Sequence, residues 1–243
     1  MVFKTRSQGF NSEVRMVDVV IYGDSIMKGA TPEGGSRYRS VLPRFLPTLM
    51  EKYGLAVTNR ARFGCTIDKG YAMLQKDLSA QIAPYHFALV EYGGNDCDYD
   101  WKAVAAAPDA NHQPHTSIAE FLRTLEHMAD ELIQKGVKPL LMTLPPIDAE
   151  RYLSFICRDG TNRENIVKWL GETQMIYRFQ EMYSASILKL ALHRGFPLVD
   201  VRPYFLDKHN YADLISIDGI HPSEEGYALI HTAFDEYLRL EMA

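Results

Sequence analysis

The sequence has neither an excess of positive charge nor a long apolar run. Its 26 lysine and arginine residues are outnumbered by 31 aspartate and glutamate residues, which gives a formal net charge of -5. We therefore do not expect the basic surface that attracts nucleic acid. No segment approaches the roughly 18 apolar residues of a membrane span, and the first ten residues lack the apolar core of a secretion signal. These absences predict a cytoplasmic protein that neither spans a membrane nor binds nucleic acid.

Cysteine is scarce. The three cysteines, Cys65, Cys97 and Cys157, are an odd number, and none has the spacing of a metal site. These features argue against a disulfide scaffold and against a zinc site. Cys65 and Cys97 adjoin candidate site loops, but we expect them to be small packing residues. We expect no metal and no organic cofactor.

Two common functional loops are missing as well. The Gly-x-Ser-x-Gly turn of α/β-hydrolases is absent around Ser25, because the second residue after this serine is Met27. A phosphate-binding loop is also absent, since Lys28 is neither preceded by glycine nor followed by serine or threonine. The sequence thus excludes the commonest serine hydrolase architecture and gives no sign of nucleotide binding.

Short apolar runs alternate with longer segments of helical period along the chain. We predict five strands, at residues 17–22, 55–59, 87–92, 138–144 and 197–201. Four of them are nearly continuous apolar stretches, which is typical of a parallel sheet with helices on both faces. The pattern predicts an α/β fold, a three-layer α/β/α sandwich with a five-stranded parallel sheet. A chain of 243 residues fits a single domain over 1–243.

The helix signals differ in strength. Residues 118–133 carry one apolar stripe, which follows a Ser-x-x-Glu capping box and is followed by a glycine. The spacing of apolar residues over 165–193 predicts one or two helices, and a final helix is expected to begin near Ser223. Residues 38–53 also have helical period, but two prolines within them predict a late start or a kink.

Polar residues and a glycine follow the first three predicted strands. Ser25 comes after the first strand, where we expect a helix to begin, Gly64 after the second and Asn95 after the third. The carboxyl ends of parallel strands meet at one edge of a sheet, and reacting groups gather there. The pattern therefore predicts that Ser25, Gly64 and Asn95 lie at a common edge.

Asp218 and His221 lie three residues apart near the carboxyl end of the chain. A serine hydroxyl is a poor nucleophile near neutral pH and needs a histidine as base and a carboxylate to orient that histidine. Gly219 permits a tight turn between the two residues, so that Asp218 can reach Nδ1 of His221 while Nε2 stays free. Ser25, His221 and Asp218 are thus candidates for a catalytic triad.

Four blocks of the sequence resemble the conserved blocks of the SGNH hydrolases, the GDSL esterase and lipase superfamily, and stand in the same order. They are Gly23-Asp24-Ser25-Ile26, Asn59-Arg60-Ala61-Arg62-Phe63-Gly64, Gly93-Gly94-Asn95-Asp96 and Asp218-Gly219-Ile220-His221-Pro222. The first block differs from the family name only by isoleucine in place of leucine. The blocks span residues 19–228, which is nearly the whole chain. The resemblance implies the flavodoxin-like fold of these hydrolases.

The resemblance also implies a role for each residue. Ser25 would be the nucleophile, with Asp218 and His221 as acid and base. The backbone N–H groups of Ser25 and Gly64 and the Asn95 amide would form the oxyanion hole. Attack on an ester places negative charge on the carbonyl oxygen, and removing one preorganised donor costs on the order of 10²- to 10³-fold in rate.

Each of these residues also has a simpler interpretation. Serine is a frequent helix N-cap, so Ser25 alone would carry little weight. Asp218 can be a turn residue and His221 a hydrogen-bonded loop histidine. Asp96 is expected to be a structural partner within its loop. The four blocks together favour the catalytic interpretation for Ser25, Asp218 and His221, whereas the other seven histidines have no comparable context.

Three segments fall outside the expected core. Residues 97–116 and 145–165 follow predicted strands and are expected to be insertions that shape the substrate site, and residues 1–15 are expected to be an N-terminal extension. Tyr99 and Trp101 are candidates to stack on a sugar or to line an acyl pocket, although plain packing is the favoured interpretation of both. Asp24, inside the first block, is a third candidate for substrate contact.

These features predict a serine esterase that hydrolyses small-molecule carboxylic esters through an acyl-enzyme. Short-chain acyl or acetyl esters, with a carbohydrate as one candidate alcohol, are the first choice. An acyltransferase, a lysophospholipase or a thioesterase would use the same residues. A protein that binds ligands on an inactivated hydrolase fold is the non-enzymatic alternative. The sequence does not indicate the oligomeric state.

Overall fold

A five-stranded parallel sheet forms the centre of the protein. The computed structural model describes residues 16–34, 37–80 and 85–241, so the expected extension over residues 1–15 lies outside the described part. The strands stand in the order β4 (Leu55–Asn59), β1 (Val17–Gly23), β5 (Phe87–Glu91), β6 (Lys138–Met142) and β7 (Leu198–Val199). All neighbouring pairs are parallel. The predicted sheet is confirmed, although the last strand is shorter than expected.

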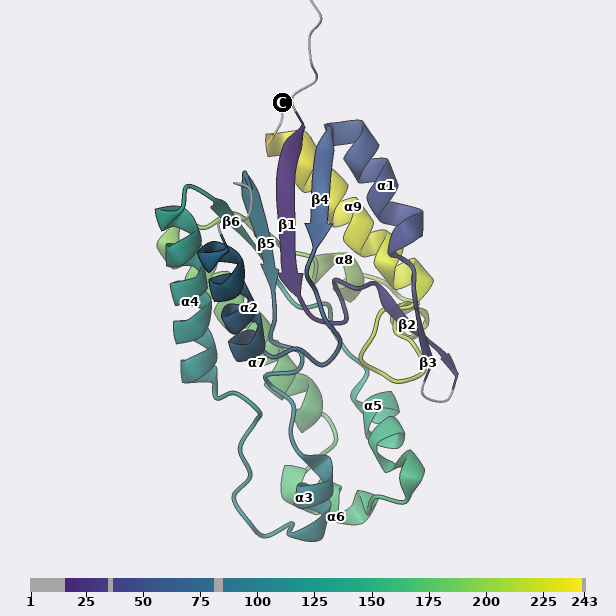
Figure 1. Cartoon of the computed structure of the whole chain (residues 1–243). Helices are drawn as coiled ribbons and strands as arrows, with labels where there is room; N and C mark the ends of the chain where they lie inside the picture. Colours follow the sequence, from purple (N-terminus) through teal and green to yellow (C-terminus); the bar gives the residue numbers. More distant parts are fainter. Residues whose placement is uncertain (1–15, 35–36, 81–84, 242–243) are drawn as a thin grey trace, which may run out of the picture.

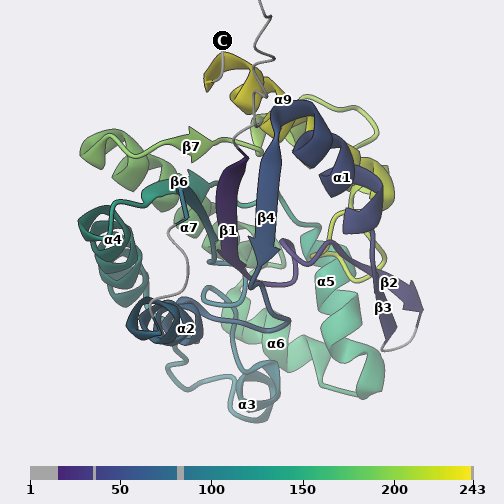
Figure 2. The ribbon, with the colours of Figure 1, turned by 45° about the horizontal axis from the view of Figure 1, so that its top comes forward.

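Helices cover both faces of this sheet (Figures 1 and 2). One face packs against α2 (Ile67–Ser79), α4 (Ile118–Gln134) and α7 (Met175–Arg194), and the other against α1 (Leu42–Tyr53), α8 (Pro203–Leu206) and α9 (Glu224–Glu241). Helix α4 begins at the predicted capping box. The expected three-layer sandwich is therefore confirmed. No helix in the described residues is both long and apolar enough to cross a bilayer.

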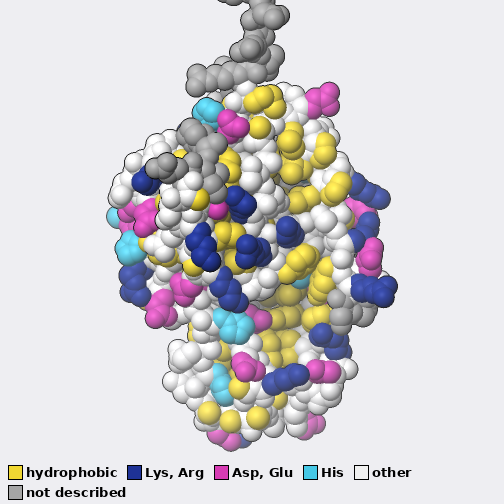
Figure 3. All heavy atoms as spheres, viewed as in Figure 1, with side chains coloured by type: hydrophobic (Ala, Val, Ile, Leu, Met, Phe, Trp, Pro, Cys, Tyr) yellow, Lys and Arg dark blue, Asp and Glu magenta, His cyan; other side chains and the backbone are white. Residues whose placement is uncertain are grey.

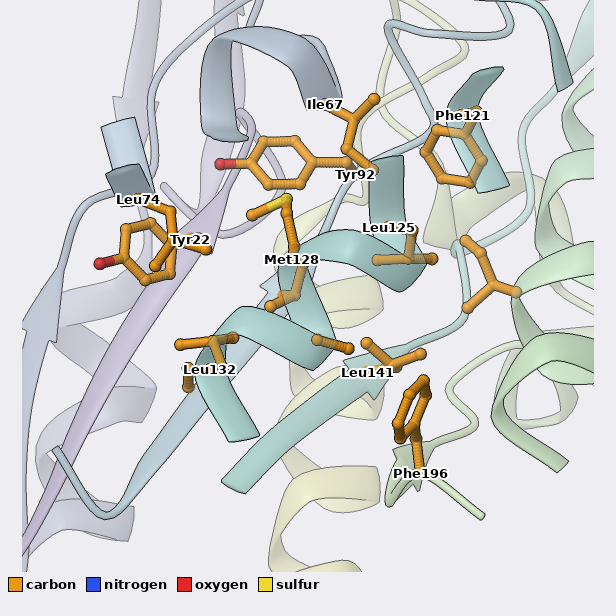
Figure 4. Packing of buried hydrophobic residues seen from close by; sticks show 14 of the residues in the cluster. Tyr22, Ile67, Leu74, Tyr92, Phe121, Leu125, Met128, Leu132, Leu141 and Phe196 are labelled. Carbon is orange, nitrogen blue, oxygen red and sulfur yellow. The ribbon is translucent and has the colours of Figure 1, made fainter. Parts of the chain in front are cut away.

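Alternate residues of each strand point to opposite faces, which explains the continuous apolar runs. Tyr22 of β1 and Leu141 of β6 join the core on the α2, α4 and α7 side, where Phe121 and Leu125 of α4 are almost fully buried (Figure 4). Ile21 and Met142 point to the other side. Burial of a large apolar side chain stabilises the fold by about 1.5–3 kcal/mol, so the sandwich is held from both faces.

A smaller lobe lies beyond the carboxyl ends of the strands (Figure 1). It contains α3 (Trp101–Ala106), α5 (Ala149–Ile156), the 3₁₀ turn η1 (Cys157–Asp159) and α6 (Arg163–Leu170). A cluster rich in aromatic and aliphatic side chains packs these elements together. The segments 97–116 and 145–165 supply most of the lobe, next to the edge where the candidate site residues gather.

The prediction of a helix that begins at Ser25 is wrong. No helix begins at Ser25: residues 25–29 form a turn that Gly29, with a φ of 67°, leads into β2 (Ala30–Gly34). β2 pairs with β3 (Arg37–Ser40) as an antiparallel hairpin. The helix expected over 38–53 therefore starts only at Leu42, as its prolines predicted. The segment 165–193 forms two helices, α6 and α7, and the 3₁₀ turn η2 (Tyr211–Leu214) precedes the last helix.

Candidate active site

The sheet order brings three candidate residues to one edge. Strands β4, β1 and β5 are neighbours, and Gly64, Ser25 and Asn95 follow their carboxyl ends. The turn after β1 is closed by hydrogen bonds from the N–H of Gly29 to the carbonyl of Ile26 (2.8 Å) and from the N–H of Ala30 to the carbonyl of Ser25 (3.0 Å). This turn replaces the expected helix and fixes the backbone that carries the Ser25 hydroxyl.

Ser25, His221 and Asp218 form one continuous hydrogen-bonded chain. Nε2 of His221 lies 2.8 Å from Oγ of Ser25, and Nδ1 of His221 lies 2.7 Å from Oδ2 of Asp218. The exposed fraction falls from 9% at Ser25 to 6% at His221 and 0% at Asp218. Ser25 and His221 thus both border the cavity, whereas Asp218 is fully enclosed. This is the arrangement in which histidine removes the serine proton and the carboxylate orients the ring.

The turn from Asp218 to His221 stabilises the charged carboxylate. Burial alone would raise the pKa of Asp218, but hydrogen bonds from His221 and from the Ile220 N–H hold this pKa below its ordinary value. Oδ1 of Asp218 accepts the backbone N–H groups of Ile220 and His221, both at 3.1 Å. Gly219, with a φ of 81°, makes the turn possible. Asp218 is therefore held as an anion beneath His221.

The expected oxyanion donors occupy the same edge. Nδ2 of Asn95 donates to Oδ2 of Asp24 at 2.8 Å, which fixes the amide with its nitrogen toward the carboxylate. Gly64 has a φ of 61°, and the space where a Cβ would lie is open within 4 Å. A side chain at position 64 would fill that space. The roles of Ser25, Gly64 and Asn95 as oxyanion donors remain predictions.

A small cavity of about 70 Å³ opens beside Ser25. Trp101, one of the predicted substrate residues, lines it together with Ile147 and with Ile176 and Phe179 of α7. Figure 3 shows a band of hydrophobic side chains between the β2–β3 hairpin and this lobe. Nε1 of Trp101 donates to Asp98 at 2.8 Å, and the Tyr152 hydroxyl donates to the same carboxyl group at 2.6 Å. The indole is thereby held in place as a cavity wall.

The other two predicted substrate residues lie elsewhere. Tyr99 is not among the residues that line the cavity: its ring packs 5.0 Å from those of Trp169 and Phe179 in the core of the lobe. Asp24 borders the cavity but is only 1% exposed, and both of its side-chain oxygens accept hydrogen bonds from the protein. The structure thus gives Tyr99 a packing position and Asp24 a position that supports neighbouring residues.

Asp96 also lies within the protein rather than at the cavity. Its carboxyl group accepts the N–H of Ile67, at the start of α2, and the hydroxyl of Thr116 at 2.7 Å. Burial, opposed by these hydrogen bonds, raises the pKa of Asp96 to about 6. Burial also raises the pKa values of the Cys65 and Cys97 thiols. These environments agree with the structural roles expected of all three residues.

Sequence reasoning missed Tyr38 and Glu91. The ring of Tyr38, on β3, lies 5.1 Å from the imidazole of His221 and 6.0 Å from the ring of Phe63. Burial, together with the charge of Asp218, raises the pKa of Tyr38 to about 12. Glu91 is fully buried next to Asp24. A carboxylate at the end of an apolar strand is the feature of the sequence that could have indicated Glu91. Tyr38 had no such feature, because it lies in a segment of helical period.

Known proteins resemble this chain along most of its length. A GDSL esterase/lipase of rice (Oryza sativa subsp. japonica), WDL1, is 24% identical over 225 residues, which cover 91% of this chain and 76% of the rice protein. The structure of an acetyl-xylooligosaccharide esterase variant from Geobacillus stearothermophilus superimposes with a TM-score of 0.66 at 20% identity, covering 91% and 94% of the two chains. A lipase/acylhydrolase from Enterococcus faecalis superimposes with a TM-score of 0.59 at 21% identity, covering 92% and 94%.

The family itself is identified by the sequence. Residues 21–229 match the model of the GDSL-like lipase/acylhydrolase family, and this range includes Ser25, Asn95, Asp218 and His221. The structural matches extend the agreement to the SGNH hydrolase fold. The chain therefore belongs to the GDSL-like lipase/acylhydrolase family of carboxylic ester hydrolases.

Proposed function

We propose that the protein is a serine esterase that hydrolyses short-chain acyl esters, with an acetyl group as the preferred acyl part. The observation that carries this proposal is the hydrogen-bonded chain from Asp218 through His221 to Ser25, which ends at a cavity of about 70 Å³. The family supplies the reaction class, carboxylic ester hydrolysis. The acyl chain length and the alcohol follow from the surroundings of Ser25.

The reaction proceeds in two acyl transfers. Nε2 of His221 takes the proton as Oγ of Ser25 bonds to the ester carbonyl carbon, and the carbonyl electrons move to the oxygen, which faces the N–H groups of Ser25 and Gly64 and the Asn95 amide. The tetrahedral intermediate collapses, its bond to the alcohol oxygen breaks, and His221 gives the proton to that oxygen. A water molecule then loses a proton to His221 as its oxygen attacks the carbonyl carbon of the acyl-Ser25 ester. The bond between that carbon and Oγ of Ser25 breaks, His221 returns the proton to Oγ, and the carboxylic acid leaves.

The size of the cavity limits the acyl group. An apolar cavity of about 150 Å³ binds benzene, and the cavity beside Ser25, at about 70 Å³, has roughly half that volume. Trp101, Ile176 and Phe179 close its walls. An acetyl or propionyl group fits such a space, whereas a long acyl chain would have to displace buried side chains. This limit favours short-chain esters over lysophospholipids and long-chain thioesters.

The alcohol belongs on the opposite side, next to His221. The leaving oxygen must come within reach of Nε2 of His221 to receive its proton. Tyr38 lies beside that imidazole, and Phe63, which is 55% exposed, packs against Tyr38. Their rings, inclined at 50° to each other, offer an apolar surface to an alcohol with an apolar face, such as a sugar ring or an aryl group. A similar fold in an acetyl-xylooligosaccharide esterase from Geobacillus stearothermophilus supports a sugar as the first alcohol to test.

A panel of esters tests the acyl preference. We expect kcat/KM to be highest for 4-nitrophenyl acetate, to fall at least about tenfold for the butyrate and to fall further for the octanoate, since each buried methylene that does not fit costs about 1–3 kcal/mol. The Ser25→Ala variant serves as the background control. A preference for octanoate would contradict the proposal and favour a lysophospholipase or thioesterase. Acyl transfer to an added sugar in place of water would identify an acyltransferase.

A second comparison tests the alcohol site. Phe63→Ala is expected to raise KM for acetylated xylo-oligosaccharides about tenfold, through loss of roughly 1.4 kcal/mol of contact, and to leave KM for ethyl acetate unchanged. Leu192→Ala truncates another exposed apolar side chain, on α7 and outside the cavity lining, and is the matched control. If Phe63→Ala raised KM equally for both substrates, the alcohol part of the substrate would not bind at the Tyr38–Phe63 surface.

A further inference from the structure

Two carboxyl groups are buried side by side next to the oxyanion region. Glu91 ends β5 and stands in register with Gly23 of β1, so its side chain meets Asp24, the next residue of the turn. Asp24 is 1% exposed and Glu91 is 0% exposed. The N–H of Asp24 donates to Oε2 of Glu91 at 3.3 Å, which places the two buried carboxyl groups next to each other. Within the described part of the chain, neither carboxyl group has an ion pair with lysine or arginine.

The hydrogen-bond donors around the pair are distributed unequally. Asp24 accepts the N–H of Ile26 on Oδ1 and the Asn95 amide on Oδ2, both at 2.8 Å. Glu91 accepts only the long hydrogen bond from the Asp24 N–H, and its Oε1 is buried with no donor nearby in the described structure. Two neighbouring carboxyl groups in the interior cannot both be charged at moderate cost. The negative charge therefore belongs on Asp24, where the donors are, and the proton on Glu91.

We propose that Glu91 is a positioning residue of the oxyanion hole. As a neutral acid it donates a hydrogen bond to Asp24, and Asp24 in turn holds the Asn95 amide with its nitrogen toward the reacting centre. A proton on Glu91 also explains why no donor approaches Oε1. The inference rests on the proposed function, because Asn95 stabilises an oxyanion only if Ser25 attacks a carbonyl carbon.

The geometry at Asn95 shows what Asp24 contributes. A carboxylate at 2.8 Å excludes the flipped amide, whose oxygen would face the negative charge. One amide hydrogen is used for Asp24, and the other lies toward the Cys65 carbonyl at 3.4 Å, a long contact that a substrate oxyanion can replace. Without a fixed partner, the Asn95 amide would rotate between several orientations. Preorganised donors are effective because they need no reorganisation during the reaction.

The charged surroundings agree with a proton on Glu91. Burial raises the pKa values of Glu91 and Asp24, and the charge of Asp24 raises that of Glu91 further. The hydrogen bond from the Ile26 N–H and the charge of His221 pull the pKa of Asp24 back down. The other titratable groups that face the pair are those of Asp96, Cys65, Tyr92 and Tyr227.

A double-mutant cycle tests whether Glu91 acts through Asn95. Asn95→Ala is expected to lower kcat for 4-nitrophenyl acetate by about 10²- to 10³-fold, and Glu91→Met by about 10- to 10²-fold with KM unchanged. In the Asn95→Ala background, Glu91→Met should change kcat by no more than about threefold, since the donor that it positions is gone. If the fold loss in kcat of the double variant equalled the product of the two single losses, the proposal would be overturned. Leu125→Ala, which truncates a core residue of α4, controls for loss of stability alone.

Glu91→Gln provides the second test and keeps the shape. A glutamine can donate to Asp24 and accept the Asp24 N–H, so kcat should stay within about threefold of the wild type. The infrared spectrum of the wild type should contain the C=O band of a protonated carboxyl group. This band should be lost in Glu91→Gln and kept in Asp96→Asn. A glutamine variant as impaired as Glu91→Met, or an unchanged carboxyl band, would contradict a neutral Glu91. Absence of wild-type esterase activity would instead refute the proposed function, and the infrared result would still stand.

Discussion

A Cβ atom on Gly219 would lie 2.3 Å from the backbone nitrogen of Tyr152. It would also lie 2.6 Å from the carbonyl oxygen of Asp148, whose own N–H donates to the Gly219 carbonyl at 2.8 Å. The turn that carries Asp218 and His221 is thus packed directly against the start of α5. The lobe that lines the cavity beside Ser25 also supports Asp218 and His221, because α5 belongs to that lobe.

This contact predicts a large effect of Gly219→Ala. The variant must both adopt a φ of 81° and move the backbone of α5, so we expect loss of at least about 3 kcal/mol in the free energy of unfolding and a fall in kcat of at least about 10²-fold. Gly160→Ala is the matched control: its φ is 89°, but the added Cβ meets nothing within 4 Å. It should cost only about 1–2 kcal/mol. Urea unfolding and ester hydrolysis measure both effects, and equal losses would mean that the contact with Tyr152 is unimportant.

Enlarging the cavity should change the acyl preference. Ile176 is 4% exposed and lines the cavity beside Ser25. Ile176→Ala should raise the ratio of kcat/KM for 4-nitrophenyl butyrate to that for the acetate at least about tenfold, because the longer chain gains the vacated space. It should also destabilise the fold by about 2–5 kcal/mol.

Ile187→Ala provides the control for this prediction. Ile187 is 2% exposed on the same helix, α7, but belongs to the core between that helix and the sheet. Its truncation should cost a similar free energy of unfolding and leave the butyrate-to-acetate ratio unchanged. If the butyrate-to-acetate ratio of kcat/KM were similar in Ile176→Ala and Ile187→Ala, the acyl group would bind outside this cavity.

The raised pKa of Asp96 predicts a specific dependence of stability on pH. Between about pH 4 and 6 the folded state keeps a proton that the unfolded state releases, since the pKa of Asp96 is about 6 in the fold and its ordinary value is 3.8. The free energy of unfolding should therefore fall as the pH rises through this range, by about 3 kcal/mol from this group alone. In Asp96→Asn this part of the decline should be missing. Urea unfolding from pH 4 to 7 measures it, and equal slopes for Asp96→Asn and the wild type would refute the raised pKa.

The parts of the fold that could be predicted are those in which local pattern and burial agree. The strands were recognisable because helices cover both faces, so nearly every residue of β1, β5 and β6 is apolar. The last strand was overestimated, because only Leu198 and Val199 pair with β6. The sheet edge that gathers Ser25, Gly64 and Asn95 followed from the strand ends alone. The side chains that pack around these three residues could not be predicted from the strand ends.

The features that escaped prediction depend on contacts between distant segments. Residues 38–40 belong to the segment 38–53 of helical period, yet they pair with residues 30–32, and this pairing brings Tyr38 to His221. Asp24 and Glu91 are 67 residues apart and meet only through the register of β1 and β5. Tyr99 stands close to Asn95 in sequence, but its ring enters the aromatic core of the lobe because Trp169 and Phe179 lie there. No local pattern contains these partners.

Reaction of Ser25 with a fluorophosphonate, followed by intact-mass measurement and peptide mapping, tests the central claim most directly. The chain from Asp218 through His221 to Ser25 predicts one adduct per folded protein, located on Ser25 and formed far more slowly in His221→Gln and in urea-unfolded protein. Ser25→Ala should take up no adduct at this position. Folded wild-type protein that leaves Ser25 unmodified, or that reacts no faster than His221→Gln, would contradict the account.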